Sequence, residues 1–383
     1  MLYKNALFYG FWLLLTTALA YWFSYPLDIF SRHHFFGASD PSLGLWVLNW
    51  QLSQMSAGNF DQLFTGNAFY PLDRPIYFNA STFSIALLTL PVFLSTKDPY
   101  ICYGVAVFFS YILSSLGMLL LARSLKLDYV ASLLAALIFA FSESRHGFSS
   151  YAHLLTIQWM PFGLFFIHKY FDGGRRIFLY WASFFYLIQI TASAYHGIFF
   201  SIILLLVVCV LVCQKDNFCG KKFALDVVPP MLIVGIIASI YFIPYLQEAH
   251  EFGLKRSIAE QSAYGAPLVT FFSLPSSYFF GSWTSHLRHI DGGTSPGYLP
   301  ILLTTAALLT LRRTTPIKFL ISLKLKIFAI GVILLTPIVW FLKSSVATLG
   351  GQIYSDLYLH QQVVNTAIFT PLFLVAIGYF FTT

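Results

Sequence analysis

Charged residues are scarce in this sequence. Asp, Glu, Lys and Arg make up 10% of the 383 residues, whereas apolar residues make up 58%. In a soluble domain about a quarter of the residues are charged, so this composition excludes an ordinary soluble protein. The sequence also lacks alternating strand patterns, Walker-type phosphate loops and Cys/His clusters with metal-ligand spacing. These absences argue against a membrane β-barrel, a nucleotide-driven pump and a structural metal site.

Long apolar runs are what the sequence has instead. A helix of about 20 apolar residues crosses a bilayer core of about 30 Å. The sequence predicts ten such crossings, at 6–24, 100–122, 129–142, 154–171, 177–194, 197–213, 225–246, 298–311, 327–342 and 363–381. The expected fold class is therefore all-α, with residues 1–383 forming a single polytopic membrane helix bundle.

One further apolar run, 81–95, is short for a crossing. Its 15 residues would reach only about 22 Å as a helix, and Pro91 interrupts the helical hydrogen bonding. If 81–95 does not cross, most of the 22 Lys and Arg residues fall on one side of the membrane. These are Lys4, Arg123, Lys126, Lys169, Arg175, Arg176, Lys215, Lys221, Lys222, Arg312, Arg313, Lys318, Lys324 and Lys326.

Loops rich in Lys and Arg face the cytoplasm, so the sequence predicts a cytoplasmic amino terminus. The formal net charge of +7 then reflects membrane topology, and no nucleic-acid partner is expected. Two long loops share the outer face, 25–99 and 247–297. The first is expected to hold two interfacial helices, 41–57 and 81–95.

Asp40 begins the first of these interfacial helices, in "ASDPSLGLWVLNWQL". Asp followed by Pro is a good start for a helix, because the carboxylate accepts hydrogen bonds from the free amides and Pro suits the first turn. An ionised carboxylate in this place can also take a proton from a hydroxyl group. The sequence leaves both roles open.

The order of these parts resembles the GT-C fold of integral membrane glycosyltransferases. Besides the stretch around Asp40, the segments that carry the resemblance are "NAFYPLDRPIYFNAST", "AALIFAFSESRHGFSSYAHLLTIQWMPFGLFFIHKY" and "YLQEAHEFGLKRSIAEQSAYGAPLVTFFSLP". They are similar to uncharacterised bacterial GT-C-like proteins. In GT-C enzymes an acid in the first outer loop is typically the catalytic base, and Asp40 matches that position. Many members carry an acidic pair there, whereas the neighbour of Asp40 is Ser39.

The resemblance implies a polyprenyl-phosphate-linked sugar donor and a saccharide, lipid or protein acceptor, at the outer face of the bacterial inner membrane. A divalent metal is the one cofactor that it leaves open. Other candidates for catalysis or for substrate binding lie in three outer loops. Catalytic candidates are Glu143 and His153, and substrate-binding candidates are Arg74, Arg145, His146, Glu248, Lys255 and Arg256. The cations among them suit a phosphate, and His153 or Glu143 suits orientation of the acceptor.

Each of these clusters can also be explained without a functional role. The charges around 143–153 are those of an ordinary loop between two crossings, and the charges at 248–256 are those of a solvated amphipathic helix. Two other functions also fit a many-helix membrane protein. One is a transporter or flippase of lipid-linked saccharides, which should place polar residues near the middle of the membrane. The other is a non-catalytic assembly protein that keeps the fold.

Overall fold

The computed structural model describes residues 2–24, 40–80, 82–142, 151–214 and 219–253. It also describes single positions or short pieces at 145, 148, 150, 257, 273, 284, 300–303 and 305. The chain divides into two compact units, Met1–Leu204 with Cys219–Leu254 and Leu205–Phe218 with Lys255–Thr383. Only the first unit is described over most of its length, and it contains the candidate site.

All regular secondary structure in the described residues is helical. The helices are α1 (Leu2–Ser24), α2 (Asp40–Ala57), α3 (Phe83–Thr96), α4 (Pro99–Ser124), α5 (Tyr129–Ala140), α7 (Ala152–Leu155), α8 (Trp159–Gly173), α9 (Ile177–Ala192), α10 (Ala194–Gln214) and α11 (Gly220–Glu251). Two 3₁₀ turns, η1 (Phe60–Gln62) and η2 (Pro75–Phe78), lie between α2 and α3.

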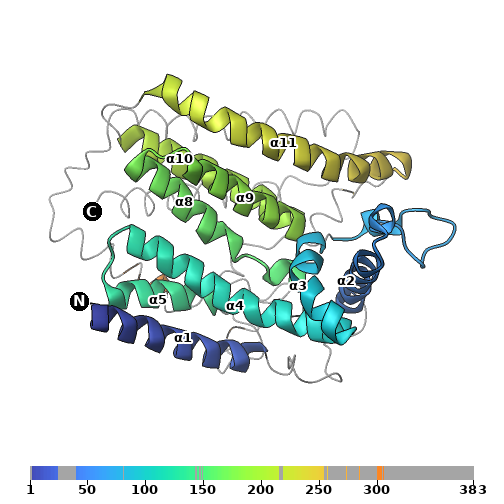
Figure 1. The fold of residues 1–383 in the computed structure, drawn as a ribbon, viewed down its shortest axis with the longest axis horizontal. Coiled ribbons are helices and arrows are strands. Elements are labelled where there is room, and N and C mark those ends of the chain that lie inside the picture. The colour runs from blue at the N-terminus through green and yellow to red at the C-terminus, as the bar shows by residue number, and fades with distance from the viewer. Residues whose placement is uncertain are drawn as a thin grey trace. The chain divides into compact units, whose positions relative to one another are not determined.

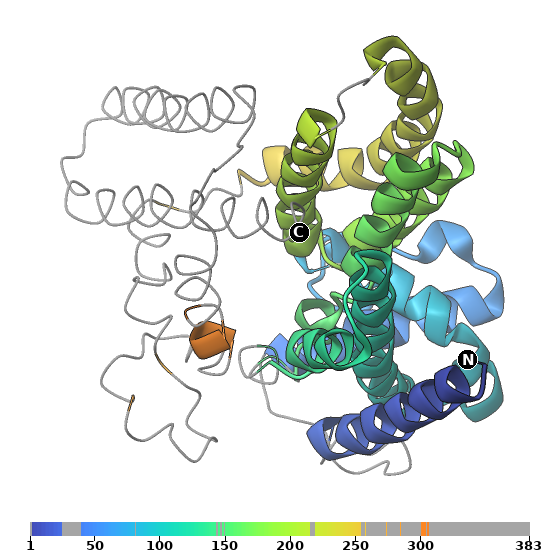
Figure 2. The same ribbon diagram turned by 90° about the vertical axis from the view of Figure 1, so that its left-hand side faces the viewer.

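Within the first unit the long helices lie side by side in a row. α1 packs on α4, α4 packs on α5 and α8, α8 packs on α9, and α9 packs on α11. Figure 1 and Figure 2 show this row from two directions. The chain reaches one end of the row at the end of α1 and leaves the same end at the start of α4, and both α2 and α3 lie at that end (Figure 1). We call it the α2 end.

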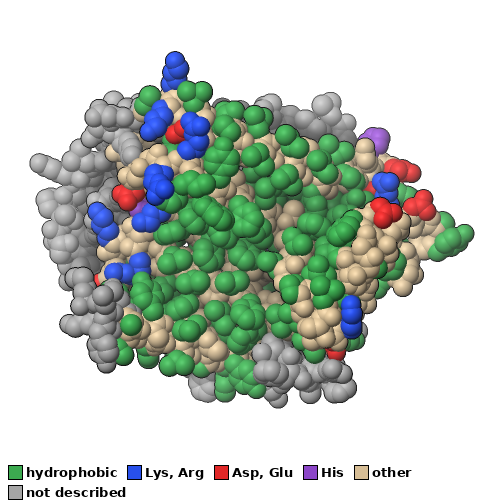
Figure 3. All heavy atoms as spheres, in the orientation of Figure 1, with side chains coloured by type: hydrophobic (Ala, Val, Ile, Leu, Met, Phe, Trp, Pro, Cys, Tyr) green, Lys and Arg blue, Asp and Glu red, His purple; other side chains and the backbone are tan. Residues whose placement is uncertain are grey.

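Charge divides the two ends of this unit. Lys and Arg gather at the end opposite α2, which holds the α4–α5 and α8–α9 connections and the start of α11 (Figure 3). We call this the basic end. Between the two ends the surface is mostly apolar (Figure 3), and large side chains such as Leu14 (74% exposed), Trp22 (77%) and Ile240 (72%) face outward. An apolar belt of this kind suits contact with lipid.

Four helices of the described residues are long and apolar enough to cross a membrane: Ala6–Ser24, Pro99–Ser124, Ala194–Gln214 and Gly220–Glu251. The protein is therefore a multi-pass helical membrane protein. Helices α5, α8 and α9 occupy three more of the predicted crossings but are shorter, with 12, 15 and 16 residues. The predicted crossings at 327–342 and 363–381, and most of 298–311, lie outside the described residues.

The main core lies at the α2 end. Leu48 and Leu52 of α2, Ile85 of α3, and Tyr103 and Tyr111 of α4 are buried together there. Because α2 and α3 pack against α4, the first long loop forms part of the fold. The helices predicted at 41–57 and 81–95 are present as α2 and α3, whereas their position in the membrane interface stays a prediction.

Candidate functional site

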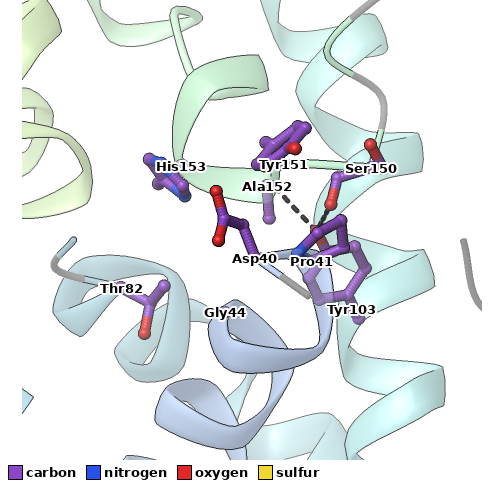
Figure 4. Close-up of a pocket in the computed structure, with 9 residues that line it drawn as sticks. All are labelled: Asp40, Pro41, Gly44, Thr82, Tyr103, Ser150, Tyr151, Ala152 and His153. Atoms are coloured by element: carbon purple, nitrogen blue, oxygen red, sulfur yellow. Dashed lines mark hydrogen bonds between the residues drawn. The ribbon is translucent and has the colours of Figure 1, made fainter. Parts of the chain in front are cut away.

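A pocket at the α2 end is built from four separate segments of the chain (Figure 4). It is a small pocket that is partly open to solvent. Its lining residues are Asp40, Pro41 and Gly44 of α2, Thr82 before α3, Tyr103 of α4, and Ser150, Tyr151, Ala152 and His153 around α7. The structure thus brings together two of the residues that the sequence singled out, Asp40 and His153.

The start of α2 places the carboxylate of Asp40 in this pocket. Asp40 is exposed, whereas its neighbour Pro41 is buried. Figure 4 shows the carboxylate of Asp40 pointing towards the imidazole of His153. An exposed carboxylate facing an imidazole across a pocket can hold a hydroxyl group between them.

Tyr103 fixes the segment that carries His153. Its hydroxyl group donates a hydrogen bond to the carbonyl of Ser150 and accepts one from the backbone N–H of Ala152, at 2.9 Å. Tyr103 itself is 1% exposed and belongs to the long helix α4. The backbone on both sides of Tyr151 is therefore tied to the most deeply packed helix of the unit.

Arg145 holds the other side of the same segment and is 4% exposed. Its guanidinium donates to the carbonyl oxygen of Ala140 at 2.6 Å and to that of Leu155 at 3.2 and 3.0 Å. It also donates to Ser110 Oγ at 3.0 Å and lies 4.6 Å from the ring centre of Tyr111. Burial lowers the pKa of Arg145 to about 10, so the side chain stays protonated at neutral pH. In this structure the guanidinium of Arg145 donates to protein groups and so holds the fold together. A role of Arg145 in binding a phosphate, as the sequence suggests, stays a prediction.

His153 is neutral in this setting. Burial is the main factor that lowers the pKa of His153 to about 4; nearby His196 lowers it further, and the charge of Asp40 partly opposes both. A neutral imidazole offers one donor and one acceptor, and which nitrogen carries the proton depends on its neighbours. His153 can therefore orient a hydroxyl group beside Asp40 without carrying a charge of its own.

No group of three or more His, Cys, Asp or Glu side chains is placed to hold a metal ion in the part of the chain that the structure describes. Asp40 and His153 would supply two ligands. Use of a divalent metal therefore stays a prediction that this geometry does not test.

A second pair of candidates meets at the end of α11. Nη1 of Arg74, before η2, lies 3.9 Å from Oε1 of Glu248. The side chain of Arg74 is 55% exposed, whereas that of Glu248 is 14% exposed. The ring of Tyr77 packs against Tyr245 with centroids 4.7 Å apart, and burial raises the pKa of Tyr77. Neither Arg74 nor Glu248 lines the pocket at Asp40.

The remaining candidates from the sequence, Glu143, His146, Lys255 and Arg256, lie outside the described residues. The sequence reading missed Thr82 and Tyr103, which line the pocket, and His196, which acts electrostatically on His153. It also missed Gln51 and Gln189, which are fully buried. A polar residue inside an apolar helix, as in "YLIQITASAYHG", is a signal that could have found Gln189.

Comparison with known proteins adds no family to this description. No protein-family model matches the chain, and no curated protein sequence matches it significantly. The class that the fold defines, a multi-pass helical membrane protein with a polar pocket at one end of its helices, rests on the structure itself.

Proposed function

We propose that this protein is a GT-C-type glycosyltransferase that moves a sugar from a polyprenyl-phosphate-linked donor to an acceptor hydroxyl group. The observation that carries the proposal is the meeting of Asp40 and His153 in one pocket at the α2 end. An acid in the first long loop is the part of the GT-C resemblance that bears on chemistry. In this structure the carboxylate of Asp40 points towards the neutral imidazole of His153.

Asp40 is the general base in this proposal. The acceptor oxygen attacks the anomeric carbon, its proton passes to the carboxylate of Asp40, and the bond from that carbon to the phosphate oxygen breaks. The phosphate leaves with the bonding electron pair, and the configuration at the carbon inverts because the displacement is single. His153 orients the acceptor hydroxyl group. Arg74, which does not itself line the pocket, is the cation proposed to stabilise the departing phosphate.

The charge distribution gives the proposal an orientation. Lys and Arg gather at the basic end (Figure 3), and cytoplasmic loops are rich in these residues. The amino terminus would then lie in the cytoplasm, and the pocket would open at the outer face of the bacterial inner membrane. Ten crossings, including those outside the described residues, complete the bundle in this proposal. A lipid-linked donor suits such a site, because its chain stays in the bilayer while its sugar reaches the pocket.

The test is sugar transfer by the purified full chain in lipid vesicles, with a panel of radiolabelled polyprenyl-phosphate sugars and extracted envelope acceptors. Asp40→Asn keeps the shape of the side chain but removes its charge and proton affinity. Loss of a general base costs about 10² to 10⁴ in rate, so we expect transfer to fall by that factor. Asp98→Asn is the matched control, because Asp98 also precedes a proline at the start of a helix.

We expect Asp98→Asn to transfer sugar at nearly the wild-type rate. If Asp40→Asn is as active as Asp98→Asn, Asp40 has no catalytic role. If the wild-type chain transfers no sugar from any donor, the non-catalytic alternatives become the better account. Mass spectrometry of lipids that copurify with the protein then separates a carrier of lipid-linked saccharides from an assembly protein.

A further inference from the structure

Asp226, near the start of α11, joins three elements at the basic end. Its carboxylate accepts a hydrogen bond from the hydroxyl group of Tyr170 in α8, at 3.0 Å, and one from Nε of Arg176 in the α8–α9 connection, at 2.8 Å. The side chain of Asp226 is 5% exposed, whereas that of Arg176 is 56% exposed. The buried carboxylate therefore holds in place a guanidinium that lies largely at the surface.

Lys222 reaches the same connection from the first turn of α11. Its Nζ lies 3.8 Å from the position that a Cβ atom would take on Gly174. Gly174 ends α8 with a φ of 67°, and Arg176 follows two residues later. The first turn of α11 is itself fixed on α8, because the rings of Phe223 and Phe171 pack with centroids 5.7 Å apart. The structure thus brings two cations from separate segments to one junction.

We call residues 174–176 and 220–222 the basic junction. Of its charged side chains, only Arg176 forms a hydrogen bond or ion pair within the described residues, and it does so through Nε alone. Arg123, elsewhere at the basic end, donates to the carbonyl of Leu127 and lies 4.0 Å from a ring centre. Cations that only set membrane topology need no fixed position. The positioned and available donors of the junction therefore suit a ligand.

Apolar side chains continue the junction along the surface of the unit. α9 packs on α11, and each helix exposes three large apolar side chains that are spaced three or four residues apart, as on one helix face. They are Ile177, Trp181 and Phe184 of α9 and Leu225, Val228 and Leu232 of α11, between 45% and 61% exposed. Figure 3 shows apolar side chains directly beside the Lys and Arg side chains of this end.

We propose that the basic junction binds the headgroup of an anionic phospholipid. The phosphate accepts hydrogen bonds from the terminal nitrogens of Arg176 and from Lys222, and the acyl chains lie along the apolar side chains of α9 and α11. A planar guanidinium can hold the carboxylate of Asp226 through Nε while its terminal nitrogens hold a phosphate. Basic pockets between membrane helices bind anionic headgroups in this way. The inference does not depend on sugar transfer.

An anionic lipid is favoured over a zwitterionic one by the charge of these segments. Arg175, Arg176, Lys221 and Lys222 outnumber the two acids of the same segments, Asp172 and Asp226. A zwitterionic headgroup brings its own cation close to this positive charge, whereas a headgroup such as glycerol does not. Phosphatidylglycerol should therefore bind more tightly than phosphatidylcholine with the same acyl chains.

The test is native mass spectrometry of the full chain in detergent, titrated with these two lipids. A single Lys near a membrane surface changes the affinity for an anionic lipid about fivefold, so Lys222→Gln should weaken binding of phosphatidylglycerol by that factor. Lys126→Gln is the matched control. Lys126 is also exposed at the basic end but lies in the α4–α5 connection, so its loss should leave the affinity unchanged.

Arg176→Lys separates geometry from charge. It keeps the positive charge but replaces the planar fork by one ammonium group, so it should weaken binding of phosphatidylglycerol about as much as Lys222→Gln. Unchanged affinity in Arg176→Lys would show that charge alone attracts the lipid and would overturn the site.

The site is also refuted if the wild-type chain binds both lipids equally, or if Lys222→Gln and Lys126→Gln weaken phosphatidylglycerol to the same extent. Inorganic phosphate in excess over the lipid distinguishes the two sources of a phosphate group. Because the acyl chains contribute to binding, phosphatidylglycerol should stay bound in its presence. Displacement of the lipid by inorganic phosphate would assign the junction to a soluble anion and contradict the proposal.

Discussion

An Asp-Pro dipeptide stands at the start of two helices of this protein, Asp40–Pro41 in α2 and Asp98–Pro99 at α4. The two aspartates lie in different surroundings. Asp98 precedes α4 and accepts hydrogen bonds from the backbone N–H groups of Tyr100, at 2.9 Å, and Ile101, at 3.3 Å. Asp40 is the first residue of α2, and its carboxylate points towards His153 (Figure 4). The capping hydrogen bonds of Asp98 reach only the next three residues, whereas Asp40 belongs to a pocket made from four segments.

The difference lies in how each site is built. A capping aspartate needs only the first turn of its own helix, so Asp98–Pro99 would form the same contact in many folds. The pocket at Asp40 depends on Tyr103 and Arg145, which hold the segment of His153 in place. Substitutions far from Asp98 should therefore leave its capping hydrogen bonds intact. Substitutions at Tyr103 or Arg145 should instead disturb the pocket at Asp40.

Removal of Arg145 should have the largest effect on stability. In Arg145→Met the carbonyl groups of Ala140 and Leu155 lose a charged, buried donor. Each unpaired buried group costs about 1 to 3 kcal/mol, so we expect the free energy of unfolding to fall by about 3 kcal/mol. Denaturation of the purified protein in detergent measures it. Arg123→Met, at the basic end, is the control, and an equal loss of stability there would show that Arg145 has no special part in the site.

The second prediction concerns pH and follows from His153. Its folded-state pKa of about 4 lies below the ordinary value of about 6.5. Above pH 6.5 the imidazole is neutral in both states, and the folded state has its full stability. As the pH falls from 6.5 towards 4, the unfolded chain binds the proton first, so stability decreases.

Because His153 is only partly buried, solvent reduces the effect, and we expect a loss of about 1 kcal/mol between pH 6.5 and pH 4.5. His153→Gln cannot titrate and should remove this part of the pH dependence of the unfolding midpoint. In Asp40→Asn the opposing charge is lost, which lowers the pKa of His153 further. The stability of this variant would then keep falling down to a lower pH than that of wild type. A pH profile of His153→Gln that matches wild type would rule out this explanation.

The third prediction concerns the cap itself. Asp98→Ala removes the acceptor for two backbone amides at the start of α4, and loss of such a cap costs about 1 kcal/mol. Asp98→Asn should keep most of this stability, because Asn caps a helix about as well as Asp. Thermal unfolding of the two variants beside wild type measures the difference. Equal destabilisation by Ala and Asn would mean that the charge of Asp98, and not its oxygen, stabilises the helix.

Local features of this protein were predictable from the sequence, and assembled ones were not. Apolar length placed α1, α4, α10 and α11, because a helix that crosses lipid must satisfy its own backbone groups whatever surrounds it. The inward turn of Arg145 has no local signature, since its partners belong to other segments. The same holds for the hydrogen bond from Thr82 to Gln51, which depends on the packing of α3 against α2.

The smallest expected effect belongs to the pair of Arg74 and Glu248. Their charged atoms are 3.9 Å apart and the side chain of Arg74 is 55% exposed, a setting in which ion pairs contribute about 0.2 to 1 kcal/mol. A double-mutant cycle of Arg74→Gln and Glu248→Gln should therefore give a coupling energy in that range, read from the unfolding midpoints.

Binding measurements can distinguish the roles of Arg74 and Glu248, which the stability measurements cannot. If Arg74 approaches the phosphate of the donor, Arg74→Gln should weaken binding of farnesyl phosphate, and its effect should shrink at high salt because the contact is exposed. Glu248→Gln removes a negative charge beside Arg74, so it should strengthen that binding or leave it unchanged. Equal weakening by both variants would mean that the pair acts only by joining the first long loop to α11, and the departing phosphate would then need a different cation.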